Sequence, residues 1–221
     1  MITSLKPIEI ASYVANQVNH IFNDASILDT NVLIKYVDSA LIRSELCFSK
    51  INNKYFYDGQ NAIFNHLNGD QYSMFLYFLS NSIYKENQSS SNLNMASKIY
   101  LLNKALHGID VFYEIELPEI FIFVHPVGTV LGRADYSNNL VVYQRCGIGA
   151  NKDNSPQLGK HLTLHPGSSI LGSSVVGDNC SIASDSILID TNLGDNTLYL
   201  GNPSSSKLKE KNNLNPIWCF D

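Results

Sequence analysis

One pattern repeats every six residues through residues 158–188, LGKHLTLHPGSSILGSSVVGDNCSIASDSIL. An aliphatic residue opens each repeat, at Leu158, Leu164, Ile170, Val176, Ile182 and Leu188. The fifth residue of most repeats is small, at Ser168, Ser174, Cys180 and Ser186, and Leu162 is the exception. Large inward side chains beside small corner residues suit a narrow prism of three flat faces, in which three hexapeptides make one turn. The stretch therefore predicts a left-handed parallel β-helix of hexapeptide repeats.

The six-residue spacing extends toward the N-terminus, through Val124, Val130, Tyr136, Val142 and Ile148. The step from Ile148 to Leu158 is ten residues, so four residues are inserted between Ala150 and Gln157 and an extruded loop is expected there. An antiparallel sandwich of short strands would instead alternate with a period of two and use hairpin turns such as Asn-Gly. This region has neither feature, so the β-helix is favoured.

Before residue 107 the apolar residues recur at the spacing of amphipathic helices. Helices are expected from about Lys6 to Phe22, from the caps Asp29 and Thr30 to Ile42, from Asp70 to Tyr84, and from Leu93 to Ala105. The polar run from Glu86 to Asn92 is expected to be an exposed loop. The sequence thus predicts an α+β protein with a helical N-terminal domain over 1–107, the β-helix over 108–203 and a C-terminal tail over 204–221.

The composition excludes several classes of protein. With 44% hydrophobic and 16% charged residues the 221-residue chain can bury a core. A net charge of −5 without a basic block argues against nucleic-acid binding. The four cysteines lie far apart, as reduced thiols do, which disfavours a zinc site or a disulfide framework. A signal-like N-terminus and an apolar run of ~18 residues are both lacking, so a cytoplasmic protein without a membrane segment is expected.

Specific motifs stand where the helical period gives way to the six-residue period. The stretch LNKALHGID (102–110) ends in Asp110, which lies 15 residues before His125. His125 opens the stretch HPVGTVLG (125–132), and Ile148-Gly149, Ile170-Leu171-Gly172 and Gly201-Asn202-Pro203 follow in later coils. Over residues 93–207 these motifs resemble the hexapeptide-repeat acyltransferases, and among them the serine acetyltransferases.

The resemblance implies acetyl transfer from acetyl-CoA, as co-substrate, to a hydroxyl group. An alcohol is a poor nucleophile at neutral pH, so an imidazole is needed to take its proton as the oxygen attacks the thioester. His125 matches that catalytic base, and Asp110 matches the carboxylate that orients the imidazole and stabilises the imidazolium. Acetyl-CoA would lie near Gly149, Ala150 and Gly172. A metal-dependent β-helix enzyme needs clustered histidines from adjacent coils, so no metal is expected.

Three departures from the family bear on the acceptor. Val124 replaces an Asp before the catalytic His, Arg133 replaces a Glu, and the loop over 151–156 lacks an Arg-His pair that grips the amino-acid carboxylate. Arg133, Arg145 and Lys152 are the candidates to replace that grip, because Arg binds carboxylates in a bidentate manner. The expected acceptor is L-serine or a serine-like molecule. A sugar or surface-polysaccharide precursor, and a non-catalytic β-helix scaffold, are the alternatives.

The resemblance also implies a homotrimer, with acetyl-CoA between neighbouring subunits and a hexamer formed by pairing of trimers as an alternative. A small-molecule acceptor is then the other partner. Family members that bind a sulfhydrylase end in a flexible tail with a terminal Ile, whereas this chain ends in Trp218-Cys219-Phe220-Asp221. That partnership is therefore doubtful, and the two aromatic residues are expected to fold back onto the body.

Overall fold

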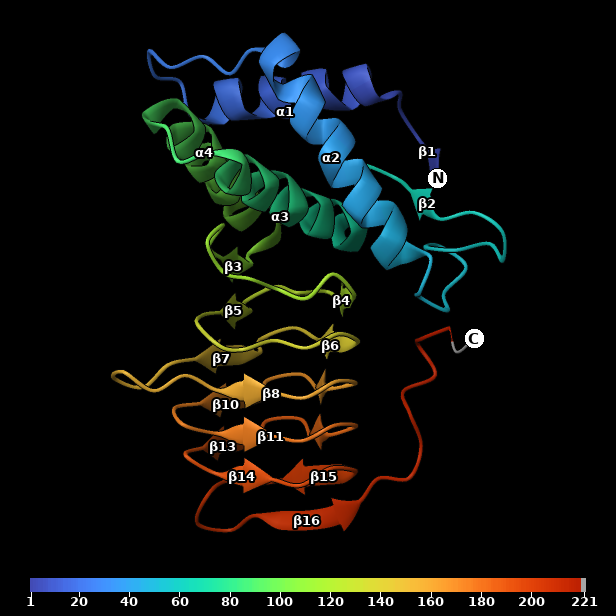
Figure 1. Ribbon diagram of the computed structural model, residues 1–221, viewed down its shortest axis with the longest axis vertical. Coiled ribbons are helices and arrows are strands. Elements are labelled where there is room, and N and C mark those ends of the chain that lie inside the picture. The colour runs from blue at the N-terminus through green and yellow to red at the C-terminus, as the bar shows by residue number, and fades with distance from the viewer. Residues whose placement is uncertain (220–221) are drawn as a thin grey trace.

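The computed structural model describes residues 1–219, as a helical layer that caps one end of a stack of short strands (Figure 1). The helices are α1 (Pro7–Ile21), α2 (Thr30–Phe48), α3 (Gly69–Glu86) and α4 (Ser90–His107). Two short strands of the helical half, β1 (Ile2–Thr3) and β2 (Ile63–Phe64), pair in parallel. All other strands belong to a solenoid, which confirms the predicted helical domain followed by a β-helix.

Side-chain caps begin three of the helices. Asp29 accepts from the backbone of Asn31 (2.8 Å) at α2, as predicted, and Asn68 accepts from Asp70 (3.1 Å) at α3. The expected loop from Glu86 to Asn92 is wrong over its second half, because α4 already begins at Ser90. The hydroxyl of Ser89 caps α4 by accepting from the backbone N–H of Asn92 (3.3 Å). A serine followed by polar residues can therefore begin a helix as well as form a loop.

The solenoid has three flat faces, each built from parallel strands of successive coils. The five-stranded face contains β3 (Asp110–Val111), β5 (Val130–Leu131), β7 (Gly147–Gly149), β10 (Ser169–Leu171) and β13 (Ile187–Ile189). The three-stranded face contains β8 (Gln157–Leu158), β11 (Val175–Val176) and β14 (Asn192–Leu193). The six-stranded face contains β4 (Phe121–Phe123), β6 (Leu140–Val142), β9 (Thr163–Leu164), β12 (Ser181–Ile182), β15 (Thr197–Leu200) and the antiparallel β16 (Lys207–Glu210).

The six-residue pattern of the later coils corresponds to the buried interior of the prism. All six aliphatic residues from Leu158 to Leu188 are buried, and Ile170 pairs with Ile148 above and Leu188 below. The small residues predicted at the corners, Ser168, Ser174, Cys180 and Ser186, are buried as well. The inserted residues form the expected exposed loop, which is closed by a bridge between Asn151 and Asn154. Large and small side chains thus divide the interior as the repeat predicts.

The predicted register is wrong in the first coil. Val130 is 51% exposed, and the buried residues are instead Phe123, which pairs with Val142, and Leu131, which pairs with Ile148. Eight residues separate Phe123 from Leu131, whereas six separate Val142 from Ile148 on the next coil. Two extra residues therefore lengthen this corner and shift the register of the residues before it, whereas Val130 is out of register because Val142 follows Leu131 by 11 residues instead of 12.

The C-terminal tail returns along the whole solenoid (Figure 1). After β16 it crosses the six-stranded face, where the amide of Asn215 donates to the hydroxyl of Thr163 (3.1 Å). It then reaches the end of α2, where Trp218 pairs with Ile51 and the backbone of Cys219 donates to Lys50 (2.9 Å). The indole of Trp218 is buried, so the predicted fold-back is confirmed for this residue. Phe220 lies outside the described residues.

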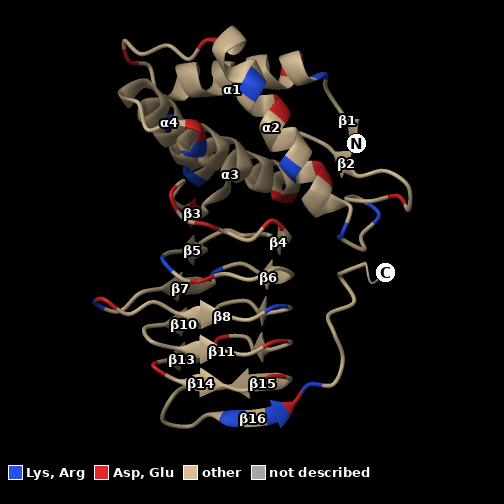
Figure 2. Cartoon of the chain, viewed as in Figure 1, with Lys and Arg blue, Asp and Glu red and all other residues tan. Residues whose placement is uncertain are grey.

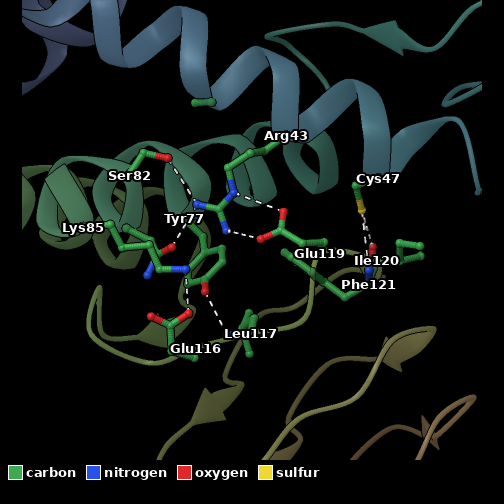
Figure 3. A network of polar contacts seen from close by, with 12 residues as sticks. Arg43, Cys47, Tyr77, Ser82, Lys85, Glu116, Leu117, Glu119, Ile120 and Phe121 are labelled. Atoms are coloured by element: carbon green, nitrogen blue, oxygen red, sulfur yellow. Dashed lines mark hydrogen bonds and ion pairs between the residues drawn. The ribbon is translucent and has the colours of Figure 1, made fainter.

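A network of polar contacts joins the helical layer to the first coil (Figure 3). The guanidinium of Arg43, from α2, donates to both carboxylate oxygens of Glu119 (3.3 and 3.2 Å) and to Asn81 of α3 (2.8 Å). The hydroxyl of Tyr77, also from α3, donates to the carbonyl of Ile115 (2.8 Å) and accepts from the backbone of Leu117 (2.9 Å). These bonds fix the segment that leads into β4 against two helices.

Charged side chains stand mainly on the helical surface and at the corners of the solenoid, and β16 adds Lys207 and Lys209 at its far end (Figure 2). The flat faces between the corners therefore carry little charge. None of the helices formed by residues 1–219 combines the length and apolarity that crossing a membrane requires.

We expect Trp218→Ala to lower the free energy of unfolding by about 3–5 kcal/mol, because the indole is fully buried and its loss leaves a cavity. Leu208→Ala is the matched control, since that side chain is 63% exposed and its loss should change the free energy by less than about 0.5 kcal/mol. Denaturant unfolding of both variants measures the difference. Equal effects for the two variants would show that the tail does not stabilise the fold.

Candidate functional site

His125 lies on the lengthened corner of the first coil, where the chain passes from the six-stranded to the five-stranded face. Its backbone is left-handed, with φ of 50°. Arg145 and Asp185, at the same corner of later coils, have φ of 57° and 55°. Gly128, rather than His125, stands directly over Arg145, because a Cβ on Gly128 would lie 3.5 Å from Cγ of Arg145. Gly128, with φ of 76°, is thus the left-handed residue that the first coil contributes to this stack, and His125 lies within the lengthened part of the corner with a left-handed backbone of its own.

The start of α3 places a carboxylate against His125. The backbone N–H of His125 donates to Oδ1 of Asp70 (3.0 Å), and its Nδ1 lies 3.7 Å from Oδ2 of Asp70. The side chain of Asp70 is 21% exposed and that of His125 is 79% exposed. Partial burial raises the pKa of Asp70, although the hydrogen bond from His125 and the nearby imidazole lower it in part. Asp70 can therefore orient the imidazole and stabilise its protonated form, leaving Nε2 for chemistry.

The sequence interpretation missed Asp70. An acidic residue in the first turn of a helix is common, because it interacts favourably with the helix dipole, and it gives no sign of a second role. Asp70 and His125 are 55 residues apart in the chain, and only the docking of α3 on the first coil brings them together. The sequence indicated that a helix begins near Asp70, but no motif close to Asp70 indicated that this residue contacts His125.

Asp110 has other partners in the described chain. One carboxylate oxygen accepts from the hydroxyl of Tyr100 (2.6 Å) and the other from Nζ of Lys104 (2.6 Å). Although burial acts to raise the pKa of Asp110, the hydrogen bonds from Lys104 and Tyr100 outweigh it, so the pKa is lowered. Among residues 1–219 the carboxylate found at the imidazole is Asp70, and the pairing of Asp110 with His125 stays a prediction.

A cavity of about 650 Å³ opens between the helical layer and the first coil. Tyr55 and Phe56 line it from the loop before β2, Asp70 from α3, and His125 from its corner. The wall on the side of the six-stranded face is formed by Ile122, Val124 and Tyr143. The C-terminal tail contributes Ile217 to the lining. Val124, which stands where the family has Asp, makes this wall apolar. The lining of the cavity thus contains one imidazole and one carboxylate, and its other side chains are uncharged.

The predicted cationic residues lie outside this cavity in the described chain. Arg145 is on the His125 corner, but its Nη2 lies 3.3 Å from Oδ1 of Asp185, two coils further along. Arg133 follows β5, and Lys152 stands in the exposed loop after β7, so both lie where the five-stranded face turns into the three-stranded face. One chain therefore brings Arg145 near His125 and keeps Arg133 and Lys152 at a different corner.

The residues predicted to contact acetyl-CoA gather at that second corner. The backbone of Gly172 donates to the carbonyl of Gly149 (3.0 Å), and Ala150 follows in the chain. Gly172 has φ of 70°, and a Cβ there would lie 2.1 Å from Oδ1 of Asp190, so the fold itself requires this glycine. The described residues contain no cluster of three or more histidine, cysteine or acidic side chains that could hold a metal ion.

Comparisons with known proteins support the fold. Neither models of protein families nor curated protein sequences gave a match. Among solved structures, the serine acetyltransferase of Neisseria gonorrhoeae is similar with a TM-score of 0.68 at 16% identity, over 94% of this chain and 81% of that one. The serine acetyltransferase of Brucella abortus also has a TM-score of 0.68 at 16% identity, and the match covers 95% of this chain and 86% of that one. The structure of the Brucella abortus enzyme in complex with coenzyme A has a TM-score of 0.66 at 14% identity, and the match covers 96% of this chain and 85% of that one. The shared feature is the helical domain followed by the β-helix.

We expect Asp110→Asn to lower the free energy of unfolding at pH 7 by about 1 kcal/mol, because the ion pair with Lys104 is lost. The folded-state pKa of Asp110 lies below its unfolded value, so its contribution is present above the unfolded pKa and is lost as the pH falls through the folded pKa. The difference between the variant and the wild type should therefore shrink toward about pH 3. Denaturant unfolding at both pH values measures it, with exposed Glu114→Gln as control. A difference that is the same at both pH values would contradict this role.

Proposed function

We propose that this protein is an acetyl-CoA-dependent O-acetyltransferase that acts on the hydroxyl of serine or a serine-like small molecule. The observation that carries the proposal is the imidazole of His125, held beside the carboxylate of Asp70 at the mouth of a cavity. The structural likeness to serine acetyltransferases, one of them in complex with coenzyme A, is the second support. Residues 93–207 also carry the motifs that resemble that family.

In this reaction Nε2 of His125 takes the hydroxyl proton as the acceptor oxygen attacks the thioester carbonyl. The new C–O bond forms, the C–S bond breaks, and the departing sulfur of coenzyme A receives the proton from the imidazolium. Asp70 faces Nδ1 and so stabilises the imidazolium while it holds that proton. Because the imidazole is largely exposed in one chain, the acceptor and its surroundings must exclude water during the transfer.

The active protein is proposed to be a homotrimer, with acetyl-CoA between neighbouring prisms. The tail covers the six-stranded face, whereas Val130 and Ile187 are exposed on the five-stranded face and Val127 at the corner beside it. Apart from Asp110 of β3, which is paired with Lys104, the described strands of this face carry no charged side chain, and the face joins the His125 corner to the corner that holds Gly149, Ala150 and Gly172. A second prism against it would supply the other wall of a groove for the long arm of coenzyme A.

We expect His125→Ala to lower turnover by roughly 10²–10⁴-fold, the loss that removal of a general base produces. Release of the coenzyme A thiol from acetyl-CoA in the presence of L-serine measures it. His20→Ala is the matched control, because that histidine is exposed on α1 and lies outside the cavity. Circular dichroism checks that the fold is retained. If the His125 variant keeps nearly wild-type turnover, His125 is not the base.

Light scattering at sub-micromolar concentration is expected to give a mass near three or six times that of one chain. The apolar side chains of the five-stranded face should drive this association, so Val130→Asp should weaken it. Leu208→Asp, on β16 at the far end of the solenoid, is the matched control and should leave the mass unchanged. A stable single-chain species with full activity would contradict the shared site.

A further inference from the structure

The outer side of the six-stranded face is apolar in its first two coils. Successive residues of a strand point to opposite sides of a sheet, so the residues that precede the inward series of this face point outward. In the order of the coils these outward residues are Ile122, Val141, Thr163 and Ser181. The outward side of a strand is usually polar, as Thr163 and Ser181 are. The apolar side chains of the first two coils therefore need a cover, which may come from the protein or from a ligand.

This apolar strip continues into the cavity beside His125. Val124 lies two residues beyond Ile122 on the same outward side, and its backbone N–H donates to the carbonyl of Val142 on the next coil (2.9 Å). Ile122, Val124 and Tyr143 line the cavity, and Phe56 lines it from the loop before β2. Val124 and Tyr143 are partly buried and pack against the core. Two coils and one loop thus present apolar side chains to the same space.

The returning tail adds Ile217 to this wall. The carbonyl of Ile217 accepts from the backbone N–H of Asn52 (2.6 Å), and its own N–H donates to the side chain of Asn215 (3.1 Å). The side-chain amide of Asn52 also donates to the carbonyl of Pro216 (3.1 Å). Backbone groups of the tail therefore make the bonds that hold this segment. The side chain of Ile217, which is partly buried and lines the cavity, is free to contact a bound molecule.

All of these side chains belong to one chain and lie on the six-stranded side of the His125 corner. A neighbouring prism against the five-stranded face, as proposed above for acetyl-CoA, leaves this wall in place. The thioester would then reach His125 from the five-stranded face, and the body of the acceptor would lie in the cavity. Sites for small molecules commonly combine apolar walls with a few polar groups that orient the ligand.

We propose that the acceptor is an alcohol with an apolar substituent, which packs in a subsite formed by Ile122, Val124 and Ile217. This inference rests on the proposed acetyl transfer and narrows the acceptor to serine-like molecules that bear an alkyl or aryl group. Burial of that group favours binding by about fourfold for each methylene. Val124 and Ile217 are then specificity-determining residues, one from the first coil and one from the tail.

Three acceptors test the subsite: L-serinamide, L-serine N-butylamide and L-serine. The two amides have the same charge and the same hydroxyl group, and they differ by one butyl group. Release of the coenzyme A thiol measures turnover, and lability of the product to hydroxylamine distinguishes the ester from an amide. We expect kcat/KM for the butylamide to exceed that for L-serinamide by at least about tenfold, because several methylenes become buried.

Two variants test the wall by different means. Ile217→Ala shortens the side chain, whereas Val124→Thr keeps the branched shape and adds a hydroxyl group. Each should reduce the preference for the butylamide by at least about fivefold, through a lower kcat/KM for that acceptor. Leu214→Ala is the matched control and should leave the preference unchanged, because this apolar side chain of the tail is exposed and lies outside the cavity.

The fluorescence of Trp218 shows whether the tail stays docked in the Ile217 variant. Trp218 is the single tryptophan of the chain, and its indole is buried next to Ile217 in the sequence. We expect Ile217→Ala to keep the emission maximum of the wild type, because the bonds to Asn52 do not use the side chain of Ile217. A red shift would show that this side chain anchors the tail, and would overturn its assignment to the subsite.

The outcomes separate the two proposals. Equal use of the two amides, or turnover of L-serine without turnover of either amide, overturns the inference about the acceptor and leaves acetyl transfer intact. Retention of the preference in Ile217→Ala or in Val124→Thr shows that the apolar group binds elsewhere and also overturns the inference. Absence of His125-dependent turnover with all three molecules overturns the proposed function and, with it, this inference.

Discussion

The bonding of Arg43 to Glu119 is the contact on which the geometry of the site depends. It fastens α2 to the segment before β4, and through Asn81 it fastens α3 as well (Figure 3). The side chain of Arg43 is mostly buried, whereas that of Glu119 is 45% exposed, so the guanidinium end of these charged hydrogen bonds is the part shielded from water. Because α3 also carries Asp70 at its other end, any shift of the helix on the first coil would move the carboxylate away from His125.

The two parts of the molecule contribute different properties to the site. The solenoid fixes the backbone of His125 at a lengthened corner, and the helical layer supplies the carboxylate and part of the cavity wall. Parallel strands hold each corner at a defined height and so fix the position of the imidazole, whereas the opposite wall of the cavity is built from loops and a helix end. The residues of the helical layer that line the cavity can therefore change without disturbing the β-helix.

The sequence was informative where structure is determined locally. From Leu158 to Leu188 each inward residue is specified by its own hexapeptide, so the register was predicted correctly. The first coil was misplaced at Val130 because Val142 follows the inward Leu131 by 11 residues, one fewer than the two hexapeptides that the prediction assumed, and at Val124 because the next corner toward the N-terminus is two residues longer. His125 was identified from its motif, but Asp70 was not, because contact between them depends on the docking of two distant segments. Burial of Trp218 was foreseen from its apolar character, whereas its partner Ile51 could not be.

The return of the tail changes how the solenoid can come apart. In a stack of coils each coil contacts its neighbours only, so a free end can fray one coil at a time. Here the last coil is tied through β16 and Asn215 to a segment that docks on Lys50 and Ile51, beside the first coil. Fraying of the final coil would therefore strain the contacts of the tail with Lys50 and Ile51. It would also displace Ile217, which lines the cavity. The stack therefore behaves as a loop closed on itself, in which opening at the far end affects the cavity beside His125.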